Sequence, residues 1–264
     1  MSKLVLIVTC FALVVAQACE GPDEAKVQTV VAEAAQTALK LGEQKVETEV
    51  ARSKETAVAK IKTEAAKKGL AVWKVGLDPG HGWADTRGAE GSGMLEREVV
   101  LDIALRTKQI LERDPRFQVV MTRTADDLEH GLAQAAKVMN EAGVSVVVSI
   151  HANAGKGTGT EACYTVGKST DAQSQELAQL LVDAVADKLS LGVRGIFPEN
   201  TKDRCARTET TGWTQLYIHD MDMPAAVIET AFIDNANDAK LLRDRRQDFA
   251  QAIAEAMRVY VQSH

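Results

Sequence analysis

Short apolar runs alternate with helical patterns along the chain from Gly69 onward. The clearest strand is Val144–Ile150, a near-continuous run of β-branched residues, as expected for a strand with both faces covered. Further strands are predicted at 73–77, 117–122, 161–166 and 225–228, and helices at 95–113, 132–142, 174–189 and 248–261. This alternation predicts a single α/β domain with a mostly parallel or mixed central sheet flanked by helices.

The segment before this domain has a different pattern. Residues 23–68 are rich in Ala and contain neither Pro nor an aromatic residue. Small apolar residues recur there at helical spacing, as at Val27, Val31 and Ala34, and the composition favours a helix. Such a stripe buries little surface, so residues 19–70 are predicted to form a helical spacer or weak coiled coil. A solvated, flexible linker is the alternative.

The N-terminus, residues 1–18, has the pattern of a signal peptide. Its apolar run Leu4–Val15 is shorter than the roughly 20 residues of a membrane-spanning helix. Ala16 and Ala18 are the small residues that a signal peptidase needs, and Cys19 follows directly. A Cys there resembles the lipid acceptor of bacterial lipoproteins, although Leu is more usual at the position of Ala16. We expect export to the periplasm or cell envelope, with membrane attachment if Cys19 is lipidated; the alternative is plain secretion.

Composition narrows the class of protein further. The 264 residues are 45% hydrophobic and 26% charged, which excludes a collagenous or wholly disordered chain. The formal net charge of −6 offers no basic surface for nucleic acid, so we expect no nucleic-acid partner. Among the aromatic residues only Phe11 precedes residue 72. The folded domain is therefore assigned to residues 71–264, and we expect it to be a monomer.

Four ionisable residues occupy related places in this pattern. His81 follows the first predicted strand, His151 follows the β-branched run, Glu229 ends the strand that begins at Ala225, and Glu96 opens the first helix. Ligands of open α/β sheets bind at the carboxyl edge of the strands. Two imidazoles and one carboxylate are a ligand set of hydrolytic zinc sites that keep a position open for water. A second carboxylate could then move the proton of that water.

Each of these residues also has an ordinary structural interpretation. A His at a strand end is commonly a hydrogen-bonded structural residue, and a Glu at a helix start complements the helix dipole. The separations of 15, 55 and 78 residues between His81, Glu96, His151 and Glu229 form no local metal-binding signature. Spacing alone therefore leaves both interpretations open.

Five segments together resemble one family. They are Leu77–Gly82, Leu95–Leu101, Val120–Arg123, Ser149–Ala154 and Met223–Asn235. Their order is that of the zinc-dependent N-acetylmuramoyl-L-alanine amidases of the amidase-3 family, which are cell-wall hydrolases. The resemblance extends from about Lys74 to Tyr260, essentially the whole predicted domain.

The resemblance implies a function. His81, Glu96 and His151 match the family's ligands for one Zn²⁺, and Glu229 matches its catalytic glutamate. The implied substrate is peptidoglycan, cleaved at the amide between N-acetylmuramic acid and L-alanine of the stem peptide, with Glu229 as general base. Two alternatives remain, a zinc peptidase that cuts within the stem peptide and a non-catalytic wall-binding lipoprotein.

Other features carry weaker expectations. Trp83 replaces a customary Gly in the loop after His81, which puts substrate contacts there in doubt. Residues 194–213 form a polar loop long enough to serve as a lid. Arg123 is expected to pair with Asp126 or Asp127. Cys163 and Cys205 could form one disulfide in an exported protein, and two free buried thiols are the alternative.

Overall fold

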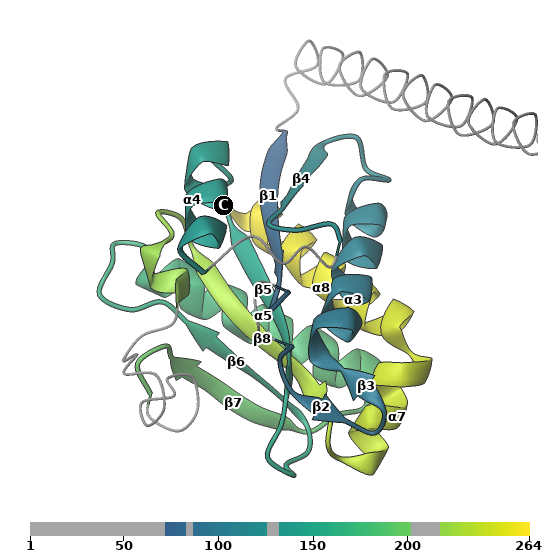
Figure 1. Cartoon of the computed structure of the whole chain (residues 1–264). Coiled ribbons are helices and arrows are strands. Elements are labelled where there is room, and N and C mark those ends of the chain that lie inside the picture. The colour runs from purple at the N-terminus through teal and green to yellow at the C-terminus, as the bar shows by residue number, and fades with distance from the viewer. Residues whose placement is uncertain (1–71, 83–86, 126–131, 202–216) are drawn as a thin grey trace, which may run out of the picture. The chain divides into compact units, whose positions relative to one another are not determined.

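A computed structural model describes residues 72–82, 87–125, 132–201 and 217–264. These residues form one α/β domain in which a six-stranded mixed sheet is flanked by helices, as the sequence predicts (Figure 1). The strands are β1 (Trp73–Pro79), β2 (Glu90–Gly91), β3 (Met94–Leu95), β4 (Phe117–Met121), β5 (Val147–Asn153), β6 (Thr160–Tyr164), β7 (Val193–Pro198) and β8 (Ala225–Phe232). The helices are α3 (Glu96–Leu111), α4 (Leu132–Ala142), α5 (Asp171–Leu189), the 3₁₀ turn η1 (Tyr217–Asp220), α7 (Ala236–Asp244) and α8 (Arg246–Ser263).

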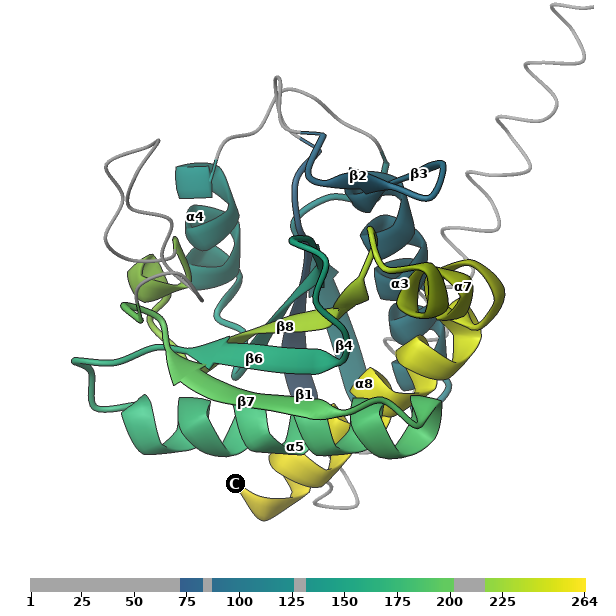
Figure 2. The same ribbon diagram turned by 90° about the horizontal axis from the view of Figure 1, so that it is seen from below.

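The strand order of the main sheet is β4-β1-β5-β8-β6-β7. The first four strands in this order run parallel, β6 runs antiparallel to β8, and β7 runs parallel to β6. The carboxyl ends of β1, β5 and β8 therefore lie at one edge of the sheet, together with the amino ends of β6 and β7. Figure 2 shows this edge for β8, β6 and β7. Side chains from five strands can meet at this edge.

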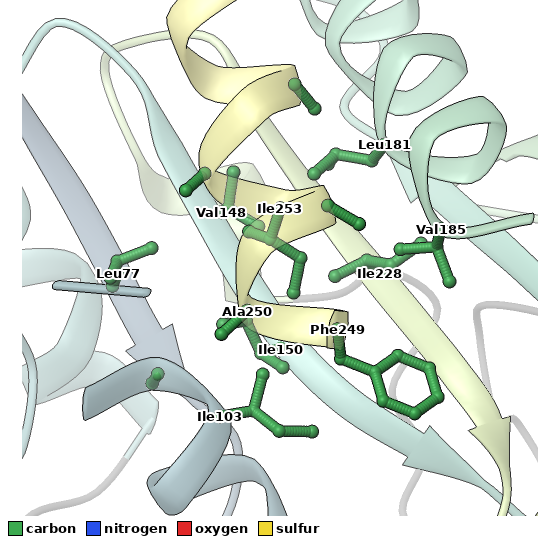
Figure 3. Packing of buried hydrophobic residues seen from close by; sticks show 14 of the residues in the cluster. Leu77, Ile103, Val148, Ile150, Leu181, Val185, Ile228, Phe249, Ala250 and Ile253 are labelled. Carbon is green, nitrogen blue, oxygen red and sulfur yellow. The ribbon is translucent and has the colours of Figure 1, made fainter. Parts of the chain in front are cut away.

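Helices cover the two faces of the sheet unequally. Side chains of α3, α5 and α8 pack on one face and form the larger hydrophobic cluster with the strands. Figure 3 shows this cluster, where Phe249 and Ile253 of α8 lie close to Ile150 and Ile228 of the sheet. On the other face, α4 and η1 enclose a smaller cluster built around Met139, which is fully buried. The second face is apolar only where this smaller cluster covers it.

Two strands extend beyond their predicted ends. The predicted strand 144–150 pairs with β1 from its first residues, since Ser145 N donates to Lys74 O at 2.7 Å. It continues through Asn153 because β8 remains beside it, and β8 itself extends to Phe232. The prediction that His151 follows a strand and that Glu229 ends one is therefore wrong in detail. Both residues lie inside strands, near the carboxyl ends.

Several short elements do not appear in the sequence prediction. Val193–Pro198 was expected to belong largely to a polar loop, but it forms the strand β7, whose one partner among the described strands is β6. The hairpin of β2 and β3 turns at Ser92 and Gly93, whose φ values are 51° and 74°, as type I′ turns require. Helix α7 begins after Asn235, whose side chain accepts hydrogen bonds from two backbone amides of its first turn.

Some predicted features lie outside the described residues. They include the signal peptide 1–18, the spacer 19–70, Cys19, Trp83, Asp126, Asp127 and Cys205. Cys163 of β6 is disulfide-bonded, and every other cysteine of the chain lies outside the described residues. Within the described part of the chain, no helix combines the length and apolar character needed to cross a membrane.

Candidate metal centre and active site

The turn after β1 brings two imidazoles together. Gly80 N donates to Ile150 O at 3.0 Å, which ties the turn to β5. A Cβ at Gly80 would lie 2.4 Å from Nε2 of His151, so only glycine fits between the strands. The next residue, His81, has a left-handed backbone with a φ of 62°, a conformation that costs energy for most residues other than glycine. Its ring centroid lies 4.9 Å from that of His151.

Glu96 is held by backbone amides at the start of α3. Its Oε2 accepts a hydrogen bond from Ala89 N at 2.7 Å, and its Oε1 accepts one from Ala152 N at 3.0 Å. The same two oxygens face the imidazoles, with Oε2 3.1 Å from Nε2 of His81 and Oε1 3.0 Å from Nδ1 of His151. Because Glu96 is only 4% exposed, both imidazoles approach a fixed carboxylate.

These three side chains form a group that could hold a metal ion. One ligand atom from each of His81, Glu96 and His151 lies within 4.8 Å of the others. Burial disfavours the ionised form of Glu96, but hydrogen bonds to His151 and His81 and their charges hold its pKa well below the usual range. Burial also opposes a charge on His151, yet the hydrogen bond to Glu96 and the nearby carboxylates of Glu96, Glu229 and Asp78 raise its pKa to about 9. The carboxylates at this edge therefore favour a positively charged group.

Glu229 lies beside this group by sheet register. Its Cα pairs with that of His151 on the parallel neighbour β5, and paired residues of adjacent strands project to the same face. Two hydroxyls tie the strands together here. Thr230 Oγ1 donates to His151 O at 2.8 Å, and Thr160 Oγ1 donates to Glu229 O at 2.9 Å. The fourth residue predicted from the sequence is thus next to the three possible ligands.

Arg123, two residues after β4, cross-links the two segments that carry His81 and Glu96. Its guanidinium donates to Pro79 O and Gly80 O, both at 2.9 Å, and to Arg97 O at 2.8 Å. The side chain is almost fully buried. The predicted partners Asp126 and Asp127 lie outside the described residues, so that pairing stays a prediction. The carbonyl contacts show a structural role that the sequence did not reveal.

A polar group on the far side of Glu229 also escaped the sequence analysis. Glu161 of β6 is the antiparallel register partner of Glu229 and is 3% exposed. Its Oε1 accepts from Asn153 Nδ2 at 2.7 Å, and its Oε2 accepts from Arg194 Nε at 2.7 Å. Recognition of β7 would have been the signal for this group, because β7 is what places Arg194 beside Glu161.

Asp78 has a structural function in this arrangement. It is fully buried, and its two oxygens accept hydrogen bonds from Thr122 Oγ1 at 2.6 Å and Ser149 Oγ at 2.8 Å. These bonds connect β1 with β4 and with β5 just below the two imidazoles.

Comparison with known proteins identifies the family. A family model described as N-acetylmuramoyl-L-alanine amidase matches residues 75–259, which is more than half of the chain. The chain belongs to this amidase family. The match covers β1 through nearly all of α8, and therefore includes all four predicted site residues of the amidase domain.

Individual relatives agree with this result. The chain is 31% identical over 182 residues to N-acetylmuramoyl-L-alanine amidase CwlM of Bacillus licheniformis, an alignment that covers 69% of this chain and 64% of that protein. It is 33% identical over 181 residues to LytC of Bacillus subtilis, covering 67% of this chain and 33% of LytC. The chain thus spans less than two thirds of the length of these curated relatives.

A solved structure shares the amidase fold. The catalytic domain of CwlV, an amidase from Bacillus (Paenibacillus) polymyxa var. colistinus, superposes with a TM-score of 0.61 and 28% sequence identity. The similarity covers 73% of this chain and 100% of that domain. The described domain is therefore the counterpart of a complete amidase catalytic domain.

Proposed function

We propose that this chain is a zinc-dependent peptidoglycan hydrolase that cleaves the amide between N-acetylmuramic acid and L-alanine of the stem peptide. The observation that carries the proposal is the convergence of His81, Glu96 and His151 beside Glu229 at one edge of the sheet. Membership of the amidase family and the names of its relatives support the choice of scissile bond.

The three converging residues fit a single zinc ion. Two imidazole nitrogens and a carboxylate oxygen are donors that Zn²⁺ prefers. The contacts of Glu96 with His81 and His151, at 3.1 and 3.0 Å, involve its two different oxygens, and one donor atom from each of the three residues lies within 4.8 Å of the others. When bound, zinc would polarise the scissile carbonyl and lower the pKa of the attacking water.

Glu229 is the proposed general base and acid. It takes a proton from the water as the new C–O bond forms at the scissile carbon, and it returns a proton to the nitrogen as the C–N bond breaks. The products are the carboxylic acid of the lactyl group and the free amine of L-alanine. Thr160 and Thr230 support this role because their hydroxyls donate to the backbone carbonyls of Glu229 and His151 and so hold the two residues in place.

We extend the proposal to the whole chain. Residues 1–18 act as a signal peptide, 19–70 as a spacer and 71–264 as the catalytic domain, so that the protein works in the periplasm or cell envelope. Lipidation of Cys19 would attach it to the membrane. Globomycin should then block processing of the full chain, and Cys19→Ala should release it from membranes. A Cys19→Ala form that stays membrane-bound would contradict lipid attachment.

Mass spectrometry of digested peptidoglycan tests the activity. Purified sacculi incubated with the full chain and zinc should release intact stem peptides with a free L-alanine amine, and a chelator should stop the release. Shortened stems would indicate a peptidase that cuts within the stem peptide. No release in the presence of zinc would indicate a non-catalytic wall-binding protein.

A further inference from the structure

Arg194 is held rigidly beside the proposed active site. Its Nε donates to the buried carboxylate of Glu161, and its guanidinium stacks over the ring of Phe232 with 4.8 Å to the ring centroid. An ion pair and an aromatic stack together fix both the position and the plane of a guanidinium. The side chain is nevertheless 28% exposed, whereas that of Glu161 is 4% exposed. The guanidinium of Arg194 is therefore anchored on one side and open to solvent on the other.

The open edge still has donors available. A guanidinium carries five N–H donors, and the contact with Glu161 involves only Nε of Arg194. Within the described parts of the chain, the two terminal nitrogens of Arg194 have no hydrogen-bond acceptor. Two parallel N–H groups in this arrangement match the two oxygens of a carboxylate.

The order of the strands places this cation on one side of the scissile bond. Passing along the sheet edge, His151 on β5 is followed by Glu229 on β8, Glu161 on β6 and then β7, which carries Arg194. In the proposed reaction the carbonyl lies at the metal ligands, while the leaving nitrogen must reach Glu229. The stem peptide therefore extends from Glu229 toward β6 and β7, and the sugar lies on the opposite side.

The separation between Glu229 and the guanidinium of Arg194 matches the length of a dipeptide. Neighbouring strands lie about 4.8 Å apart, so β7 is roughly 10 Å beyond Glu229 in backbone terms, and the Arg194 side chain reaches back over β6 to Glu161. An extended peptide spans at most about 3.5 Å per residue, so L-alanine and the second stem residue cover about 7 Å. Where the second stem residue is a glutamate linked onward through its γ-carboxyl group, its α-carboxyl group, free or amidated, lies beside the peptide chain at about this distance.

We propose that Arg194 binds the α-carboxylate of the second stem residue and makes the enzyme prefer the free acid over the amide. The proposal rests on the proposed amidase function and adds a specificity-determining residue to it. Glu161 acts as a positioning residue that keeps the guanidinium in place. Recognition by a charge-assisted pair predicts about a tenfold or greater preference in kcat/KM.

The test compares two uncrosslinked glycan-strand substrates that differ only in this carboxyl group, free or amidated. The zinc-loaded wild-type chain should cleave the free acid with at least about tenfold higher kcat/KM. Arg194→Gln should bring the ratio of the two kcat/KM values close to one while cleavage of the amide continues. Arg194→Lys keeps a charge opposite Glu161 but loses the planar fork, and should give an intermediate ratio. It also covers the case in which the Gln variant fails to fold.

Arg116 offers a matched control. It pairs with Asp114 and stacks over Trp73, also at 4.8 Å, and its exposure of 32% is close to that of Arg194. It precedes β4 at the opposite edge of the sheet, so Arg116→Gln should keep the wild-type ratio. Equal cleavage of both substrates by the wild type, or an unchanged ratio in both Arg194 variants, would overturn the proposal and leave the amidase function standing. Cleavage of neither substrate would overturn the amidase function itself, and this proposal with it.

Discussion

The two faces of the sheet differ in the side chains that they present along β5 and β8. On the face covered by α3, α5 and α8, apolar residues continue along β5 and β8 through Ile150 and Ile228 (Figure 3). On the face covered by α4, the apolar cluster includes Val147 and Val227 and then ends. Further along the same strands, His151 lies four residues beyond Val147 and Glu229 lies two residues beyond Val227. One face is a continuous core, and the other is a core that becomes a site.

The difference between the two faces explains how the fold tolerates buried polar groups, whose loss of hydration costs free energy. Buried carboxylates such as Glu96, Asp78 and Glu161 lose hydration, and each is compensated by specific hydrogen bonds. The continuous core on the other face fixes the strands that carry these groups. Changes on the two faces should therefore have separable consequences, one for chemistry and one for stability.

The largest effect is expected from a change on the sheet face that carries the proposed active site. Glu229→Gln should lower turnover of sacculi by about 10²- to 10⁴-fold, because the general base is lost. Zinc content should remain one ion per chain, since His81, Glu96 and His151 are intact, and the midpoint of thermal unfolding should change little. Stem-peptide release and metal analysis of the same preparation check both. Wild-type turnover by a variant that carries zinc would refute the role of Glu229.

The second effect belongs to the continuous core. Phe249 is fully buried on α8, and Phe249→Ala should lower the free energy of unfolding by about 3–5 kcal/mol because it leaves a cavity. The turnover per folded molecule should stay near the wild-type value at temperatures well below unfolding. Urea denaturation and activity assays measure the two quantities. A large loss of turnover in the folded fraction would show that the two faces are not separable.

The sequence predicted the parts of the molecule that follow from strong periodicity. The long helices and the β-branched strand are confirmed, although that strand continues from Ile150 to Asn153, because amphipathic and fully buried patterns extend over many residues. The predicted group of His81, Glu96 and His151 also converges, because these residues are placed by strand ends and a helix start. Their role as zinc ligands stays a proposal.

Features that depend on pairing between distant segments were not predictable in this way. Val193–Pro198 contains Arg, Gly and Pro, and it becomes a strand only because β6 offers a free edge. Without β7, the contact of Arg194 with Glu161 cannot be inferred. Arg123 was assigned to nearby acidic residues, which lie outside the described residues, and its carbonyl partners Pro79, Gly80 and Arg97 could not be foreseen because the tertiary fold brings them to it.

A third effect concerns the link between stability and metal binding. Arg123→Lys cannot maintain contacts to carbonyls on both ligand-bearing segments, so His81 and Glu96 should lose their fixed separation. We expect zinc affinity to fall about 10- to 100-fold, as is typical when groups that orient ligands are changed. Competition with a chromophoric chelator measures this affinity. A purely structural role would instead lower the unfolding midpoint equally with and without zinc, leaving the zinc-induced shift unchanged.

The smallest effects compare one hydroxyl from each side of the sheet. Ser149 Oγ donates to the buried Asp78 carboxylate, so Ser149→Ala removes a partner from a buried charge and should cost about 1–3 kcal/mol of unfolding free energy. Thr107 of α3 is equally buried, but its Oγ1 donates only to Ile103 O, which belongs to its own helix. Thr107→Val keeps the shape and should change stability by less than about 1 kcal/mol, because hydroxyl bonds to the preceding helical turn contribute little. Urea denaturation of both variants measures the two losses of unfolding free energy. Equal losses would mean that the hydroxyl bonded to Asp78 contributes no more to stability than the hydroxyl of Thr107.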